Sequence, residues 1–165
     1  MTRKSFEIAL RKGEIGEAII KKILEEKGWC VYRPETAGAH CFDILAILKK
    51  SQCIAIDVKA KAAMKYYPAT GINQKHFEEY QSFSKKHSMP FWLFFVDENI
   101  KKIYGNTLQE LEKPRLISGQ QYPWLKKISG AVLRLWPLSA MKTVGSISEE
   151  QAKKLMEYSQ RAYEY

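Results

Sequence analysis

The sequence predicts one α/β domain in which helices flank a central mixed sheet. Its 165 residues suffice for one sizeable core, and 45% hydrophobic with 27% charged content is ordinary for a globular protein. The hydrophobic pattern of the first hundred residues indicates the order α-β-β-β-α-β. Because no repeat or low-complexity segment divides the chain, we expect one domain over 1–165. Its core spans about 5–106, and a C-terminal strand and helix elaboration spans about 107–165.

The first helix is predicted over "KGEIGEAIIKKILEEKG", where apolar residues recur at helical spacing. Its apolar stripe consists of Ile15, Ile19, Ile20, Ile23 and Leu24. Gly28 is the expected end of the helix, and "WCVYR" follows as a short strand. After the loop "PETAGAH", the strands "CFDILAIL" and "QCIAIDVKAK" are joined by the polar turn "KKS".

The core continues with a loop at "MKYYPATG" and a second helix at "INQKHFEEYQSFSKKH". The helical pattern predicts a buried face made of Ile72, His76, Phe77, Tyr80, Phe83 and His87. Next, "FWLFFV" is apolar at both parities, which is typical of a strand buried on both faces. The turn "DEN" then leads into a strand at "KKIYG".

The last third of the chain has a weaker pattern. The segment "LEKPRLISGQQYPWLKKISG" contains two prolines and two glycines, so we expect an irregular connection, followed by a strand at "AVLRLWPL". Ser148 and Gln151 have the spacing of a capping box at the start of a terminal helix. That helix is predicted to bury Ala152, Leu155, Met156, Ser159 and Ala162.

The chain is strongly basic, with 27 Lys and Arg against 18 Asp and Glu, a net charge of +9 and a pI near 9.4. This excess favours a polyanionic partner, either nucleic acid or an acidic membrane surface, although an evenly spread basic surface is the alternative. No apolar run approaches the ~20 residues of a membrane span, and no hydrophobic signal segment follows the charged N-terminus. We therefore expect no membrane partner.

The three cysteines, Cys30, Cys41 and Cys53, include no CxxC pair. An odd, unpaired set suits a reducing compartment, so we expect an intracellular, cytoplasmic protein. Together with His40 the thiols could be imagined as a zinc site, but they lack zinc-ligand spacing. Cys30 and Cys53 stand in apolar runs, where we expect buried thiols.

Two carboxylates are the unusual feature of the predicted hairpin, because Asp43 and Asp57 each lie in an apolar strand. Side chains alternate along a strand, so Asp57, Lys59 and Lys61 share one face. If the strands pair, Asp43 lies beside Asp57, and two adjacent carboxylates raise a pKa or require a cation such as Mg²⁺. The alternative is an exposed hairpin with weak Asp–Lys salt bridges, against which the apolar flanks "CIAI" and "ILAIL" argue.

The first helix supplies a third carboxylate. On a helical wheel Glu17 lies at the edge of the apolar stripe, whereas Glu14 lies in solvent. Gly16 lies at the centre of the stripe and would allow the helix to approach the strands closely. We therefore expect Glu17, and not Glu14, to face the sheet.

Taken together, "GEIGEAIIKKILEEKGW", "FDILAI" and "IAIDVKAK" resemble the PD-(D/E)xK nuclease superfamily, in particular archaeal Holliday-junction resolvases and restriction-endonuclease-like proteins. The resemblance implies a restriction-endonuclease-like αβββαβ core over about residues 10–100. It implies an active site made of Glu17, Asp43, Asp57 and Lys59. Two departures are Asp57, where resolvases usually have glutamate, and Phe42, where the family pattern has proline.

The resemblance also implies hydrolysis of phosphodiester bonds with Mg²⁺ or Mn²⁺. Asp43 and Asp57 would hold the metal, with the Val58 carbonyl and Glu17 as further ligands. A bound metal lowers the pKa of its water, and Lys59 would position the nucleophile or stabilise developing negative charge. No small-molecule cofactor is implied.

Basic and aromatic residues follow the third strand and suit contacts to DNA phosphates and bases. This set consists of Lys61, Lys65, Tyr66, Tyr67 and Lys75. A solvated loop with packed tyrosines is the alternative for it. Gln74 is added because related nucleases often place glutamine near the metal, and His40 because it precedes Asp43 by three residues, although an ordinary surface histidine is favoured there.

These observations predict a metal-dependent DNA endonuclease, of the Holliday-junction resolvase type, that acts as a homodimer. The dimer is implied by the resemblance alone. The main alternative is a nucleic-acid-binding module that retains the nuclease fold without catalysis. A membrane-surface adaptor has little support, because no helix combines a Lys/Arg-rich face with a Trp/Phe-rich one. The shape of the substrate, and the choice between DNA and RNA, are left open by the sequence.

Overall fold

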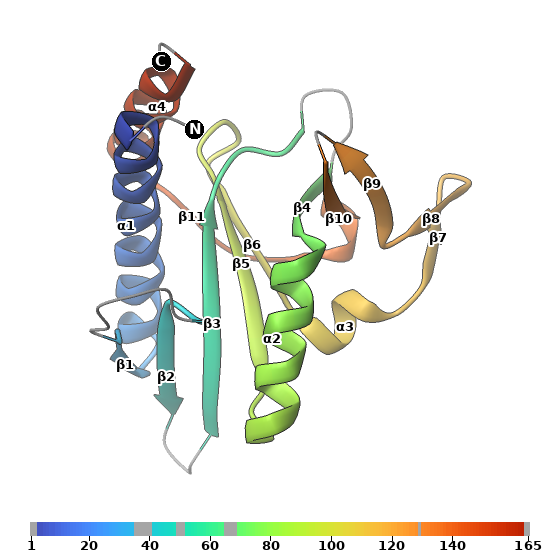
Figure 1. Cartoon of the computed structure of the whole chain (residues 1–165). Helices are drawn as coiled ribbons and strands as arrows, with labels where there is room; N and C mark the ends of the chain where they lie inside the picture. The colour runs from blue at the N-terminus through green and yellow to red at the C-terminus, as the bar shows by residue number, and fades with distance from the viewer. Residues whose placement is uncertain (1–2, 35–40, 49–51, 65–68, 129, 164–165) are drawn as a thin grey trace.

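The computed structural model describes residues 3–34, 41–48, 52–64, 69–128 and 130–163 (Figure 1). Within these residues, a main sheet has the strand order β1-β2-β3-β5-β6-β11. Its strands are β1 (Cys30–Tyr32), β2 (Ile44–Leu48), β3 (Gln52–Ala60), β5 (Phe91–Asp97), β6 (Lys102–Thr107) and β11 (Lys142–Ser146). The β3–β5 pair is parallel and the other pairs are antiparallel. The sheet is therefore mixed, as predicted.

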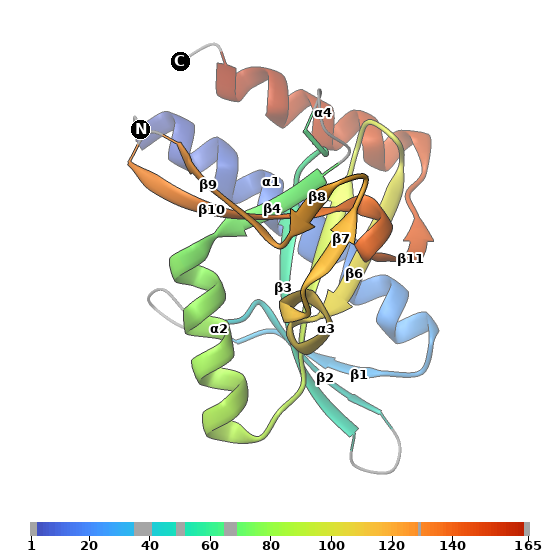
Figure 2. The same cartoon turned by 90° about the vertical axis from the view of Figure 1, so that its right-hand side faces the viewer.

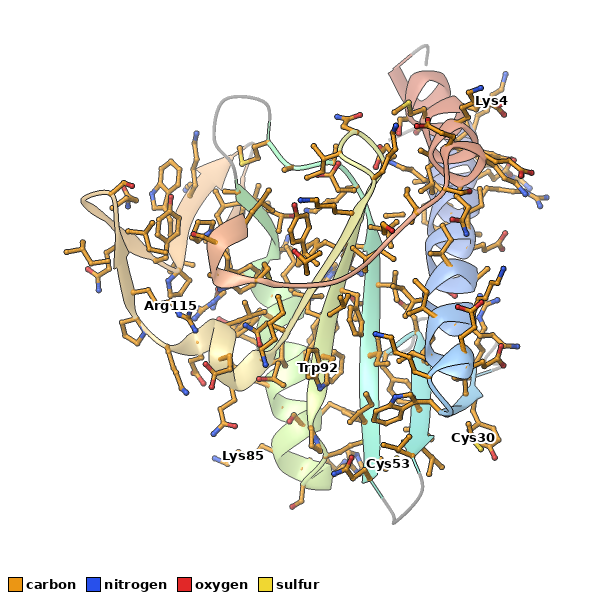
Figure 3. The ribbon with its side chains drawn as sticks, turned by 180° about the vertical axis from the view of Figure 1, so that it is seen from behind. Lys4, Cys30, Cys53, Lys85, Trp92 and Arg115 are labelled. Carbon is orange, nitrogen blue, oxygen red and sulfur yellow. The ribbon has the colours of Figure 1, made fainter. Side chains whose placement is uncertain are left out.

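Helices cover both faces of this sheet. On one face, α1 (Arg3–Glu26) and α4 (Glu149–Tyr163) pack against each other and contribute to a core with Ile54, Ile56 and Val58. On the other face, α2 (Gln74–His87) and α3 (Leu108–Glu112) contribute to a second core with Ala55 and Phe95. Figure 3 shows the molecule from behind, with Trp92 on the face that carries α1. The predicted α/β architecture with flanking helices is confirmed.

The first helix is longer than the pattern indicated, because α1 begins at Arg3 and not near Lys12. Its first turns carry the exposed side chains of Phe6 and Leu10, so an analysis based on a buried stripe could not include them. The helix ends at Glu26, and Gly28, the expected stop, follows in the closing turn with a φ of 85° that is accessible to glycine.

A small antiparallel sheet has the order β4-β10-β9, with β4 (Ala69–Asn73), β9 (Trp124–Ile128) and β10 (Ala131–Pro137). Ile72 of β4 and Trp136 of β10 belong to the core on the α2 face, and Figure 2 shows this sheet on that side. The prediction of a loop running directly into a helix at Ile72 was wrong. Strand β4 forms there because β10, some 60 residues later, supplies its hydrogen-bond partner.

Helix α2 therefore starts later, at Gln74, and Asn73 caps it by accepting a hydrogen bond from the Lys75 N–H. Phe77 and Tyr80 are buried as predicted, but His76 and His87 are exposed, so their assignment to the core was wrong. A helix packed on one side buries a stripe narrower than the set that was assumed. His87 instead lies against the Phe83 ring, with centroids 4.6 Å apart.

The segment expected to be irregular is regular. It contains the end of α3, the hairpin of β7 (Arg115–Ile117) and β8 (Gln120–Tyr122), and strand β9. Its prolines lie between these elements or at strand ends, where the missing N–H costs little. Strand β11, which pairs with β6 at the edge of the main sheet, was not predicted at all.

The terminal helix follows the prediction closely. Ser148 and Gln151 form the reciprocal capping box, with donor–acceptor distances of 2.8 and 3.2 Å. Ala152 and Leu155 are buried as predicted, Met156 and Ser159 are only half-buried, and the side chain of Ala162 lies outside the described part of the chain. The expected burial of the thiols was wrong for Cys30, which is exposed at the edge strand β1, and Cys53 is only half-buried on β3. None of the described helices has the length and apolar character needed to cross a membrane.

Candidate active site

The candidate site lies where β2 begins and β3 continues beyond it. The last pair of the β2–β3 register is Ile44 with Ile56, and the Asp43 N–H still donates to the Ile56 carbonyl at 2.8 Å. Residues 57–60 of β3 therefore extend past the end of β2. The N-terminal half of α1 covers this end, and the two together line a cavity of about 270 Å³.

Asp57 is the most buried carboxylate of the site, with 3% of its surface exposed. Its Oδ1 accepts two hydrogen bonds, from Lys59 Nζ at 2.7 Å and from the Tyr80 hydroxyl at 2.8 Å. Its Oδ2 is buried and has no hydrogen-bond partner among the described residues. A buried carboxylate oxygen without a partner is costly, so this atom indicates a place for a cation or an ordered water.

Asp43 is beside Asp57, as the strand pairing predicts, and its Oδ2 accepts a hydrogen bond from the Val58 N–H at 2.7 Å. Burial and then the charge of the Asp57 carboxylate raise the pKa of Asp43 to about 6. The Val58 hydrogen bond and the Lys59 charge oppose this rise without cancelling it. A bound cation would relieve this repulsion between the Asp57 charge and the Asp43 carboxylate, as in a metal site.

Glu17 lies on the wall of the same cavity as Asp43 and Lys59. Glu17 is half-buried and Glu14 exposed, as the helical wheel predicts. Arg33, just after β1, forms an ion pair with the Glu17 carboxylate. Gly16 explains the close approach of α1, because a Cβ at that position would lie 2.8 Å from the Ala60 Cβ.

Lys59 and Lys61 both line the cavity. Lys61 Nζ donates to the Gly71 carbonyl of β4 and lies 5.7 Å from the centroid of the Phe95 ring. Burial and the Lys59 charge lower the pKa of Lys61 to about 8. Lys61 is thus a partly buried residue of the site, and not the freely exposed cation that a DNA-contact assignment suggests.

The carboxylates fit a divalent metal by their chemistry. Among the described residues, no group of three or more His, Cys, Asp or Glu side chains is already arranged to hold a metal ion. Lys59 and Arg33 instead neutralise Asp57 and Glu17. The unpartnered Asp57 Oδ2 and the raised pKa of Asp43 both indicate a remaining need for positive charge.

The other predicted DNA contacts divide into three groups. His40, Lys65, Tyr66 and Tyr67 lie outside the described residues. Lys75 is exposed on α2, where its Nζ lies 3.9 Å from Glu79. The Gln74 amide is held by Glu78 at 2.8 Å and Arg134 at 3.3 Å, which directs it toward β10.

Two residues at the site were missed by the sequence analysis. Tyr80 was assigned to the core by its helical position, and its hydroxyl contact with Asp57 spans 23 residues of sequence. Arg33 lies in the short segment after β1 and carries no motif. The only available signal was chemical: a tyrosine or arginine on an element facing buried carboxylates is a natural hydrogen-bond donor.

No protein-family model and no curated protein matches this sequence. Solved structures do match. A Holliday junction resolvase from the archaeal hyperthermophile Archaeoglobus fulgidus has a TM-score of 0.56 at 16% identity, over 85% of this chain and 99% of that one. A nuclease from a fusselovirus has a TM-score of 0.53 at 14% identity, over 96% of this chain and 97% of that one.

These neighbours share the mixed sheet and flanking helices described above. Identities of 14 and 16% establish likeness of fold and not of activity. The sequence motifs and the strand order indicate the same fold as these structures. The chain therefore has a restriction-endonuclease-like fold.

Proposed function

We propose that this protein is a metal-dependent DNA endonuclease that hydrolyses phosphodiester bonds at the site of Asp43 and Asp57. The observation that carries the proposal is the pair of adjacent carboxylates, one with a buried oxygen that has no hydrogen-bond partner in the described part of the chain. A fold used by nucleases and the net charge of +9 support it. Branched DNA such as a four-way junction is the substrate class we propose.

The chain's own residues define the roles in this reaction. Asp43 and Asp57 would hold Mg²⁺ or Mn²⁺, with the Val58 carbonyl and Glu17 as further ligands. When bound, the metal would polarise the phosphate and lower the pKa of a water nucleophile. Lys59 lies 2.7 Å from Asp57 Oδ1, so a phosphate entering the site would compete with Asp57 for its ammonium group.

Arg33 and Tyr80 orient two of the carboxylates, those of Glu17 and Asp57. The Arg33 guanidinium holds Glu17 at the cavity wall, and a guanidinium at this position suits an incoming phosphate equally well. The Tyr80 hydroxyl holds Oδ1 of Asp57, which leaves Oδ2 for the cation. Tyr80 thus acts through Asp57 and is a positioning residue.

The first test is a cleavage assay with labelled four-way junction, flap and linear duplex, in Mg²⁺, Mn²⁺ or EDTA. We expect metal-dependent cutting by the wild type and a loss on the order of 10³-fold or more for Asp57→Ala. Full activity of Asp57→Ala would refute the proposed site. Tight binding without cutting under any metal would favour the non-catalytic binding module.

Helix α1 offers a matched pair of variants. Glu17→Gln and Glu14→Gln each remove one carboxylate from the same helix, but only Glu17 lines the cavity. We expect Glu17→Gln to lose cleavage and Glu14→Gln to keep it. Equal effects of the two variants would show that Glu17 acts only through the charge of the helix.

A homodimer belongs to the same proposal, because cutting two strands at once takes two sites. Light scattering of the purified protein at several concentrations measures this directly. A mass near twice 19.1 kDa is the expected result. A monomer that still cuts both strands of a junction would show that the sites act one after the other.

A further inference from the structure

Most of the net positive charge of this chain lies in one segment. Residues 113–148 contain six basic residues and no Asp or Glu: Lys113, Arg115, Lys126, Lys127, Arg134 and Lys142. The rest of the chain then holds 21 basic and 18 acidic residues, a net charge of +3. Two thirds of the net charge of +9 therefore lie in a segment that forms none of the candidate active site.

Within this segment, the β9–β10 hairpin is distinguished by how its cations are placed. Lys113 and Arg115 are paired with Glu110, and Lys142 lies over the Trp92 ring on the α1 face of the main sheet. The two hairpin lysines, Lys126 and Lys127, are consecutive in sequence and lie on opposite faces of a two-stranded ribbon. Lys126 Nζ lies 5.2 Å from the centroid of the Trp124 ring, and Lys127 is exposed.

The register places cations on both faces of the hairpin. Lys127 is opposite Val132 and shares its face with Leu125, and these two apolar side chains are 38% and 52% exposed. Lys126 and Trp124 have the other parity and lie on the opposite face. The hairpin is thus a ribbon with a lysine and an apolar or aromatic neighbour on each side.

The hairpin is connected to the candidate active site through β4. Lys61 of the active-site cavity donates to the Gly71 carbonyl, Gly71 is paired with Leu135, and Leu135 is paired with Trp124. Two strand spacings, roughly 10 Å, therefore separate the Gly71 backbone from Trp124. The hairpin then continues past β4, since Val132 and Ala131 pair only with β9.

We propose that the β9–β10 hairpin is a second DNA-contact surface, which binds the phosphates of duplex flanking the bond to be cut. This inference rests on the proposed nuclease function and assigns its substrate contacts. Figure 2 shows the hairpin on the α2 side of the main sheet, directed to the same side as the N-terminal end of α1. DNA bound at the cavity between α1 and β3 would extend toward the hairpin.

The chemistry of the hairpin favours duplex DNA over other polyanions. A two-stranded ribbon fits the major groove, whose two rims are rows of phosphates. Lysines on both faces of the ribbon can each meet one rim, while Leu125 and Trp124 contact sugars and base edges. An acidic membrane would instead meet only one face of the ribbon and leave the lysine of the other face without a phosphate.

The test uses the full chain and measures binding separately from cleavage. Fluorescence anisotropy in EDTA, with a 30-bp duplex probe, compares wild type, the double variant Lys126→Gln/Lys127→Gln and the control Lys153→Gln/Lys154→Gln. The control removes the same charge from exposed lysines of α4, which packs against α1. Circular dichroism confirms that all three proteins are folded.

We expect the hairpin variant to lower the slope of log K against log salt by about 1.8 and to weaken binding ~10–100-fold at 0.1 M salt. The control should retain wild-type affinity within roughly twofold. Equal effects of the two double variants would overturn the inference, as would an unchanged affinity of the hairpin variant for DNA with lost binding to anionic vesicles. Failure of the proposed function is a separate result, namely wild-type binding without metal-dependent cutting.

Discussion

Asp57 shows how one buried residue combines structural and functional demands. Its Oδ1 carries both donors, Lys59 and Tyr80, while Oδ2 has none among the described residues. Placing both hydrogen bonds on one oxygen orients the carboxylate and leaves the other oxygen for a cation. The Tyr80 ring is held in turn by stacking on Phe91, with centroids 4.7 Å apart.

Replacing Tyr80 by Phe tests this orientation, because the ring contact with Phe91 is kept and only the hydroxyl is lost. One hydrogen bond to a charged group is worth about 1.5 kcal/mol, or roughly tenfold in an equilibrium constant. We expect the Mg²⁺ concentration for half-maximal cleavage to rise roughly tenfold. Titrating cleavage rate against Mg²⁺ measures this.

The matched control is Tyr104→Phe, which removes a hydroxyl from another buried tyrosine, 7% exposed, on β6. We expect its Mg²⁺ dependence to equal that of the wild type. A Tyr80→Phe enzyme with normal Mg²⁺ dependence, but a uniformly lower rate, would assign Tyr80 to the stability of α2 and not to Asp57.

The raised pKa of Asp43, about 6 against an ordinary 3.8, predicts how stability depends on pH without metal. Between these values the folded state holds a proton that the unfolded state has released, so the free energy of unfolding falls as pH rises. This loss of unfolding free energy is absent below pH 4 and complete above pH 6. It amounts to at most about 3 kcal/mol. Urea unfolding in EDTA at pH 4 and pH 7 measures it.

Asp43→Asn is the variant for this prediction, since an amide oxygen can still accept from the Val58 N–H. We expect the variant to match the wild type at pH 4 and to be more stable at pH 7 in EDTA. Adding Mg²⁺ should then stabilise the wild type alone. A variant that is less stable than wild type at both pH values would contradict the assigned repulsion between Asp43 and Asp57.

At the scale of elements, the contact of α1 with β3 decides where Glu17 lies. Gly16→Ala would place a Cβ 2.8 Å from the Ala60 Cβ, so the helix and strand must separate. We expect a loss of about 1–3 kcal/mol of stability from this overpacking and a lower cleavage rate, because Glu17 moves with the helix.

Gly13→Ala is the natural control, because Gly13 lies one turn earlier on α1 and, apart from the backbone of its own helix, no atom of the described residues lies within 4 Å of the added Cβ. Alanine there should stabilise the helix by up to about 1 kcal/mol and leave cleavage unchanged. Thermal unfolding and cleavage of both variants give the comparison. Gly16→Ala with wild-type stability would show that α1 can shift freely on β3.

At the scale of the whole molecule, a buried charge joins three distant elements. Glu98, in the turn after β5 and 3% exposed, accepts from Lys12 of α1 at 2.6 Å and from Ser159 of α4 at 2.9 Å. Its second oxygen has no partner among the described residues. This network connects the first helix, the centre and the last helix of the described chain.

Removing one residue of this network should therefore lower the free energy of unfolding. Lys12→Met leaves the Glu98 charge buried without its cation, and we expect a loss of about 3–5 kcal/mol. Urea unfolding measures the difference. The double variant Lys12→Met/Glu98→Gln should recover most of it, because no uncompensated charge remains. Additive losses in the double variant would show that the two residues act independently.

Local patterns predicted the elements whose rules depend on neighbours in sequence. Strand alternation placed Asp57 and Lys59 on one face, helical spacing separated Glu17 from Glu14, and the capping box located the start of α4. The strands β4 and β11 were not predicted, because their partner strands lie far away in the chain. Strand formation depends on pairing, and pairing is not a local property.

The sequence by itself determined the mixed α/β fold, the order of its first elements and the candidate carboxylates, since hydrophobic periodicity and side-chain parity are local. Only the tertiary structure decided that Tyr80 and Arg33 bind those carboxylates, that Lys61 is partly buried against β4, and that a basic hairpin lies two strands beyond Gly71. The physical reason is that burial and hydrogen-bond partners depend on which distant segments pack together.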